Sequence, residues 1–243
     1  MDFTLNDDQL ELKQAANAWL ADRFPLDRDW EMQDDHWSEL EELGWLDVAE
    51  AGLGFVEEAL LLEELGYVCY PGFYLGHVAS ITGDSGTATV DSTRPLWPVE
   101  ETPRFRAAAA AEALGVAQRA LDLGVEHAKT REQFGKPIGT YQAVSHPLAQ
   151  TYTDVELSRS LVYWAAWCVA EEDERAPLAA AAAKAFATEA AVVACERSIQ
   201  VHGGIGFTWE HPLHRFYKRA IWLEGFGKRP ADLRLEVADA LLA

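Results

Sequence analysis

Cysteine, basic residues and long uncharged apolar runs are all scarce in this sequence. Its three cysteines, Cys69, Cys168 and Cys195, have apolar or alanine-rich neighbours and no CxxC spacing. This pattern excludes a disulfide framework and a cysteine-based zinc site, and it predicts a reducing, cytoplasmic environment. No uncharged apolar run reaches the length of a membrane helix, and acids stand near the start where a secretory signal has bases. We therefore expect a cytoplasmic protein without a membrane partner.

The shortage of bases is uneven along the chain. Lys and Arg number 20 against 40 Asp and Glu, and the first 64 residues hold 19 of these acids with only 3 bases. Such a region repels polyanions, so nucleic acid and anionic membranes are poor partners. Two interpretations of the acidic region remain open: a solvated face, or a surface for a basic protein. With 243 residues, 49% of them hydrophobic, the chain can still build a sizeable core.

Apolar spacing predicts an all-α fold that is interrupted once. Helical periodicity extends over 4–23, 55–65, 107–129, 141–171, 178–200, 213–224 and 231–242. Between 66 and 105, Gly and Pro recur around β-prone fragments such as residues 87–90, which indicates a linker with at most short strands. We therefore divide the chain into an N-terminal helical domain (1–65), a linker or residual β segment (66–105) and a C-terminal helical bundle (106–243).

Two short patterns resemble functional sites without the context that such sites need. The string Gly-Asp-Ser-Gly at 83–86 resembles a serine-protease sequence, but it lies in the Gly/Pro-rich interval of a helical chain. His202, His211 and His214 have no Cys or carboxylate at a spacing that completes a metal site. We expect neither a serine nucleophile nor a metal.

A first motif with chemical potential follows the 107–129 helix. Arg131 is a permanent cation whose planar fork suits a diphosphate, and Phe134 offers a flat surface to a ring. Gln142 follows in the first turn of the next helix, where its amide can reach the same ligand. A purely structural loop is the alternative interpretation.

A second motif ends the long alanine-rich helix. Gln200 is followed by the pair Gly203 and Gly204, where no Cβ blocks the approach of a phosphate or sugar. The alternative is a glycine-rich helix stop.

In this order, and about 70 residues apart, the two motifs resemble the acyl-CoA dehydrogenase family. Residues 2–20, 62–72, 112–146 and 200–220 are also similar to that family. The resemblance implies an FAD flavoprotein that oxidises an acyl-CoA to its 2,3-enoyl form, with a carboxylate that removes the α-proton and an electron-transferring flavoprotein as redox partner. It also implies an N-terminal helical domain, a middle β-domain and a C-terminal four-helix bundle.

The resemblance assigns roles to six residues. In the family, the equivalent positions hold the ADP part of an FAD that is bound to a neighbouring subunit. Carried over to this sequence, the cofactor-binding residues are Arg131, Phe134, Gln142, Gln200, Gly203 and Gly204.

Two departures from the family pattern set the functional hypothesis. Only about 40 residues stand where a middle domain on the order of 100 residues is expected. The position of the usual catalytic glutamate falls on Gly227, and the alternative position falls on Phe105, beside Arg106. Glu224, three residues before Gly227, is the one candidate base.

The resulting hypothesis is a truncated subunit of a heteromeric enzyme. The chain would lack the base and would contribute the ADP-binding part of the FAD site of a longer acyl-CoA dehydrogenase subunit. Such pairs resemble the α2β2 enzymes of steroid side-chain degradation. Two alternatives remain: a compact stand-alone dehydrogenase that uses Glu224, and a non-enzymatic scaffold.

Overall fold

The computed structural model describes residues 5–30, 35–49, 51–79 and 99–242, and these ranges contain nine α-helices and a single pair of two-residue strands. The elements, in chain order, are α1 (Asp7–Arg23), α2 (Trp37–Glu42), α3 (Phe55–Tyr67), α4 (Tyr74–Val78), α5 (Pro103–Thr130), β1 (Glu132–Gln133), β2 (Lys136–Pro137), the 3₁₀ turn η1 (Ile138–Thr140), α6 (Gln142–Ala170), α7 (Ala176–His202), the 3₁₀ turn η2 (Gly203–Phe207), α8 (Leu213–Gly225) and α9 (Pro230–Leu242). The predicted all-α fold is confirmed.

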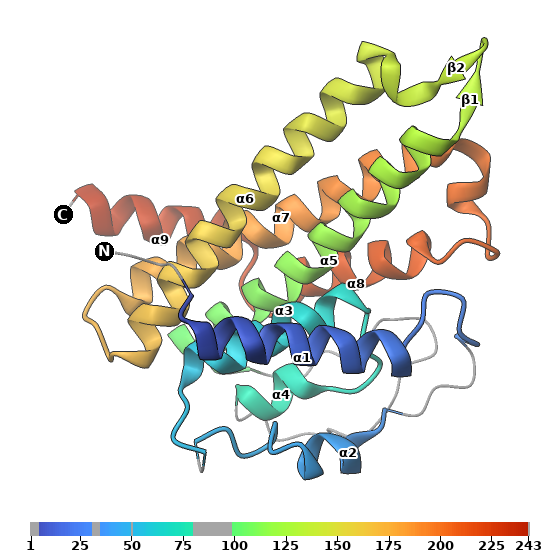
Figure 1. The fold of residues 1–243 in the computed structure, drawn as a ribbon. Helices are drawn as coiled ribbons and strands as arrows, with labels where there is room; N and C mark the ends of the chain where they lie inside the picture. Colours follow the sequence, from blue (N-terminus) through green and yellow to red (C-terminus); the bar gives the residue numbers. More distant parts are fainter. Residues whose placement is uncertain (1–4, 31–34, 50, 80–98, 243) are drawn as a thin grey trace.

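Three long helices, α5, α6 and α7, lie side by side and form the body of the bundle (Figure 1). Alanines along α5 and α7 are fully buried, including Ala109, Ala113, Ala183 and Ala187. Small side chains let two helix backbones approach closely, which explains why the alanine-rich helices are the central ones. Helix α8 packs against α7, and α9 packs against the first turns of α7. Helix α3 packs against α5 and α6 at the end of the bundle away from β1 and β2, and α1 packs against α3 (Figure 1).

Local signals start and end these helices close to where the sequence predicts. Asn6 caps α1, because its side chain accepts a hydrogen bond from the Gln9 backbone N–H at 2.8 Å. In turn, the Gln9 side-chain oxygen accepts a hydrogen bond from the Asn6 backbone N–H at 3.1 Å. Thr102 accepts from the N–H of Phe105, and Pro103 follows at the first helical position of α5.

The first described part of the interval 66–105, residues 66–79, is more ordered than its composition indicates. Its first residues complete α3 and form α4, and Tyr70, Phe73 and Tyr74 are buried in the core. Aromatic burial outweighs the Gly and Pro content here, because each ring removes a large apolar area from water. Helix α5 already begins at Pro103. The segments 83–86 and 87–90 lie outside the described residues, and the three-part division of the chain stays a prediction.

One helical stretch, Ala176–Phe207, is long and apolar enough to cross a membrane when judged by length and composition alone. Two thirds (67%) of its most apolar window is buried inside the protein. This stretch contains α7, the central helix of the bundle, so its apolar character is accounted for by the packing described above.

Candidate functional site

The first motif folds as a tight β-hairpin that projects from one end of the bundle (Figure 1). Residues 132–133 pair with 136–137 in antiparallel register. The two turn residues, Phe134 (φ 53°) and Gly135 (φ 79°), both have left-handed backbones, as a two-residue hairpin turn requires. The turn holds Phe134 away from the core, and its side chain is 93% exposed. A large aromatic ring at such a position is available to another molecule.

Arg131 and Gln142 lie at the base of this hairpin. Arg131 ends α5: its N–H donates to the His127 carbonyl at 2.8 Å, and its carbonyl accepts from the Ile138 N–H at 2.8 Å. Its backbone is thus fixed while its side chain is exposed and forms no ion pair within the ranges that the structure describes. Gln142 is the exposed first residue of α6. Both side chains are therefore presented to solvent from rigid backbone positions.

The second motif ends α7 and continues as the 3₁₀ turn η2. Gly203 has φ 65°, a left-handed conformation that favours glycine. A Cβ added at Gly203 or Gly204 would meet no atom within 4 Å, so both glycines face open space. Gly206, in contrast, is buried, and a Cβ there would lie 2.8 Å from the Ile199 carbonyl oxygen. Gln200 is exposed on the last turn of α7.

The fold brings the two motifs to the same end of the bundle (Figure 1). The ring of His127, one turn before Arg131, stacks on the ring of His202, with centroids 4.2 Å apart. Because the sequence predicts that an ADP group binds here, we call this region the ADP-binding end and define it by the six predicted residues: Arg131, Phe134, Gln142, Gln200, Gly203 and Gly204. An exposed cation, an exposed aromatic ring and an open glycine pair fit a diphosphate that carries a flat base.

Histidines surround the junction between the two motifs. The ring of His202 also lies 4.4 Å from that of His211. Burial lowers the pKa of His127, His202 and His214, and it lowers the pKa of His211 to about 4, with further lowering from the neighbouring histidines. Among the residues that the structure describes, no group of three His, Cys, Asp or Glu side chains is arranged to hold a metal ion.

The position predicted for the family's catalytic glutamate is closed in this chain. Gly227 has φ 79°, and a Cβ built on it would lie 2.0 Å from Glu101 Oε1, 2.9 Å from the Phe105 ring and 3.1 Å from Lys184 Nζ. The left-handed backbone disfavours any residue with a Cβ, and a glutamate would fit here only if the Glu101 carboxylate and the Phe105 ring moved. At the predicted position of the base, these two side chains thus occupy the space that a glutamate would use.

Glu101 is the residue at this site that the sequence did not single out. Its carboxylate accepts hydrogen bonds from the Lys228 N–H at 2.5 Å and from Arg106 Nε at 2.8 Å. Lys184, which is buried on α7, lies 3.8 Å from it and donates to the carbonyls of Phe226 and Lys228 at 2.7 and 2.9 Å. These contacts fix the orientation of the Glu101 carboxylate beside Gly227. No local sequence pattern marks it.

Glu224 faces a different hollow. It lies in the last turn of α8 and lines a depression of about 430 Å³ that also includes Glu189, Ile221 and Arg229. Burial raises the pKa of Glu224, and repulsion from Glu189 and Glu196 raises it further. A raised pKa suits a general base, but Gly227 lines the adjoining hollow, which shares Gly225 and Arg229 with this depression and is lined by Glu101 and not by Glu224.

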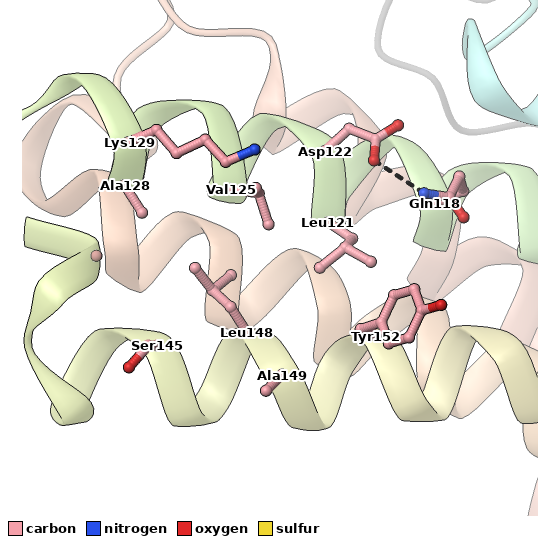
Figure 2. Close-up of a pocket in the computed structure, with 11 residues that line it drawn as sticks. Gln118, Leu121, Asp122, Val125, Ala128, Lys129, Ser145, Leu148, Ala149 and Tyr152 are labelled. Atoms are coloured by element: carbon pink, nitrogen blue, oxygen red, sulfur yellow. Dashed lines mark hydrogen bonds between the residues drawn. The ribbon is translucent and has the colours of Figure 1, made fainter.

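A further groove of about 450 Å³ lies between α5 and α6 (Figure 2). Leu121, Val125 and Leu148 form its apolar walls, and at one end Gln118 donates a hydrogen bond to Asp122 at 2.8 Å. Its apolar lining suits side chains or an apolar tail and does not suit a diphosphate.

Comparison with known families places this geometry in context. The family model described as "Acyl-CoA dehydrogenase, C-terminal domain" matches residues 99–227. The acyl-CoA dehydrogenase IpdE2 of Mycobacterium tuberculosis is 42% identical over 133 residues, which make up 54% of this chain and 39% of IpdE2. The matched segment thus spans about two fifths of that relative.

Two solved structures share the fold over nearly the whole chain. A chain of the ChsE4-ChsE5 complex from Mycobacterium tuberculosis has a TM-score of 0.80 at 21% identity, with 100% of this chain and 99% of that chain covered. A variant of the Tcur3481-Tcur3483 steroid ACAD has a TM-score of 0.79 at 24% identity, with 98% and 99% covered. At these identities the likeness establishes the fold.

Proposed function

Because this chain belongs to the acyl-CoA dehydrogenase family of FAD-dependent oxidoreductases, as its two motifs predicted, we propose that it is a subunit of a heteromeric acyl-CoA dehydrogenase. In this proposal, the ADP-binding end holds the ADP part of an FAD whose flavin ring lies on a longer partner subunit. The bound FAD supplies the redox chemistry of α,β-desaturation, and the partner supplies the base that removes the α-proton.

The observation that carries this proposal is the contrast between the two ends of the bundle. The ADP-binding end is open, with Arg131 and Phe134 exposed and with open space beside Gly203. The position of the catalytic base is closed by Glu101 and the Phe105 ring. A chain that keeps a nucleotide-binding surface and lacks room for its own base is suited to complete the site of another subunit.

The names of the two solved relatives support the partner and substrate classes that we propose. Their names describe a two-component complex and a steroid ACAD. We extend both features to this chain: an α2β2 assembly with a longer acyl-CoA dehydrogenase, and an acyl-CoA with a steroid side chain as substrate. An electron-transferring flavoprotein would accept the electrons, and the assembly would work in the cytoplasm.

The first test removes the exposed cation at the ADP-binding end. We expect Arg131→Ala to lower the FAD content of the complex formed when this chain is co-expressed with a full-length acyl-CoA dehydrogenase. A charge-assisted bond to a diphosphate contributes roughly 1.5–3 kcal/mol, so the dissociation constant for FAD should rise about 10- to 150-fold. Visible flavin absorption per complex measures the loss.

Lys129→Ala is the matched control, because Lys129 is an exposed cation two residues away that faces the groove between α5 and α6 (Figure 2). It should leave the flavin content unchanged. Full flavin content in Arg131→Ala would argue for the scaffold alternative. One FAD bound per chain in the absence of any partner would argue for a stand-alone enzyme.

A second test concerns Glu224. We expect Glu224→Gln to leave turnover of the complex unchanged, because Glu224 does not line the hollow at Gly227. The measurement is anaerobic bleaching of the flavin band by saturated straight-chain and steroid acyl-CoAs, with Glu189→Gln as control for charge removal in the same depression. Abolished bleaching in Glu224→Gln alone would identify Glu224 as the base and overturn the assignment of the base to the partner.

A further inference from the structure

Three histidines join the two halves of the ADP-binding end. His127 lies in the last turn of α5, four residues before Arg131, and His202 ends α7, two residues after Gln200. His211 lies in the segment between η2 and α8. The centroid of the His202 ring is 4.2 Å from that of His127 and 4.4 Å from that of His211, so His202 is the central member. We call these three residues the histidine row.

Backbone hydrogen bonds fix the orientation of two of these rings. Nδ1 of His202 lies 2.8 Å from the Ser198 carbonyl oxygen, which can only accept, so this nitrogen carries a proton. Nδ1 of His211 accepts a bond from the Leu213 N–H at 3.3 Å, so this nitrogen carries none. The accepting Nδ1 makes His211 a neutral imidazole, and burial lowers the pKa of His202, which favours its neutral form as well. Neutral rings can pack against one another without charge repulsion.

We propose that the histidine row sets the spacing between Arg131 and the Gln200–Gly204 turn, and thereby determines how tightly the ADP-binding end holds a nucleoside diphosphate. These histidines act through other residues and are positioning residues. The inference rests on the proposed function, because it takes the ADP part of FAD as the ligand. It assigns to the row a role that neither motif has alone, because its rings join the end of α5 to the end of α7.

The electrostatic surroundings of the row resist its protonation. The charged groups that act on His127 are His202 and Arg131, and those that act on His211 are His202, His127 and His214. His214 in turn faces Arg215 and Lys218 of α8. All of these groups are cationic or become cationic when protonated, so a proton on one ring is repelled by its neighbours.

The sign of the pH dependence follows from these lowered pKa values. The pKa of His211 falls from 6.5 to about 4. The packed histidine row is therefore most stable above pH 6.5, and its stability falls as the pH falls toward 4. The reason is that the rings bind protons more readily when they are separated and exposed to water than when they are packed together. We expect the complex to release FAD progressively over this range.

The test uses the flavin-loaded complex and compares two replacements of the central ring. His202→Ala removes the stack and should raise the dissociation constant for FAD about tenfold, since two ring contacts are lost. His202→Phe keeps a flat ring and should stay within about threefold of the wild type. His77→Ala, which removes an exposed histidine on α4, is the control and should bind FAD normally. Fluorescence of released FAD measures each constant from pH 7.5 to 4.

His202→Phe restores the ring contacts but not the hydrogen bond to Ser198. Normal FAD binding in His202→Phe would therefore assign the effect of His202→Ala to the lost ring contacts. His211→Phe should also hold FAD to lower pH than the wild type. Equal weakening in His202→Phe and His202→Ala, or unchanged binding in His202→Ala, would overturn the inference. If the histidine variants overturn this inference but Arg131→Ala loses FAD in the same assay, the proposed function still stands. If Arg131→Ala also keeps FAD, the proposed function is wrong as well.

Discussion

Replacement of Gly115 by alanine should destabilise this protein by about 3 kcal/mol or more, the largest effect that we expect from adding a single methyl group. A Cβ at Gly115 would lie 1.8 Å from the Glu63 carbonyl oxygen and 2.6 Å from the Tyr67 backbone nitrogen. Both contacts are with the backbone of α3, which cannot move aside as a side chain can. The helices α3 and α5 would have to separate, and Gly66 faces the backbone of α5 in the same way, with Glu112 O at 2.1 Å.

Urea denaturation followed by far-UV circular dichroism measures this change as a lower midpoint at unchanged slope. Gly225→Ala is the matched control: it adds the same methyl group where no atom lies within 4 Å. Its stability should stay within about 0.5 kcal/mol of the wild type. A Gly115→Ala variant as stable as this control would mean that α3 and α5 do not cross as closely as described.

The helices could be predicted because their signals are local. Asn6, Thr102 and Gly203 mark helix ends through bonds and conformations that involve only a few neighbouring residues. The two motifs of the ADP-binding end could be located for the same reason, because each is contiguous in sequence. Their approach at one end of the bundle comes from the packing of α5 against α7, which brings His127 and His202, 75 residues apart, into contact and which no local pattern predicts.

The packing of residues 66–79 could not be predicted from composition, since its cause lies far away in the chain. Phe73 packs edge-on against Trp222 at 6.1 Å, and Phe226 lies 6.2 Å from it. These partners belong to the end of α8, about 150 residues later. The closure of the Gly227 position has the same origin, because Glu101, Phe105 and Lys184 reach it from other parts of the chain. The surroundings of Gly227, the predicted position of the catalytic base, are therefore set by long-range contacts.

The second large effect should come from a buried ion pair that also joins distant parts of the chain. Glu112 on α5 and Arg219 on α8 meet with Oε1 and Nη1 2.6 Å apart, and both side chains are almost completely buried. Arg219 also donates to the Tyr70 carbonyl at 3.0 Å, so it links α8 to the segment between α3 and α4. We expect Glu112→Leu to cost about 3–5 kcal/mol, because a buried guanidinium loses this carboxylate.

The double variant Glu112→Leu with Arg219→Met distinguishes two origins of this loss of stability: the unpaired charge on Arg219 and the other contacts that Arg219 makes. If most of it comes from the charge left behind, removing both charges should recover the larger part, since an apolar pair of similar volume is often as stable as a buried ion pair. A double variant as unstable as Glu112→Leu would instead point to the bond between Arg219 and Tyr70 as the dominant contribution. Urea midpoints of the wild type, both single variants and the double variant give the coupling free energy directly. A Glu112→Leu variant as stable as the wild type would contradict the burial of this pair.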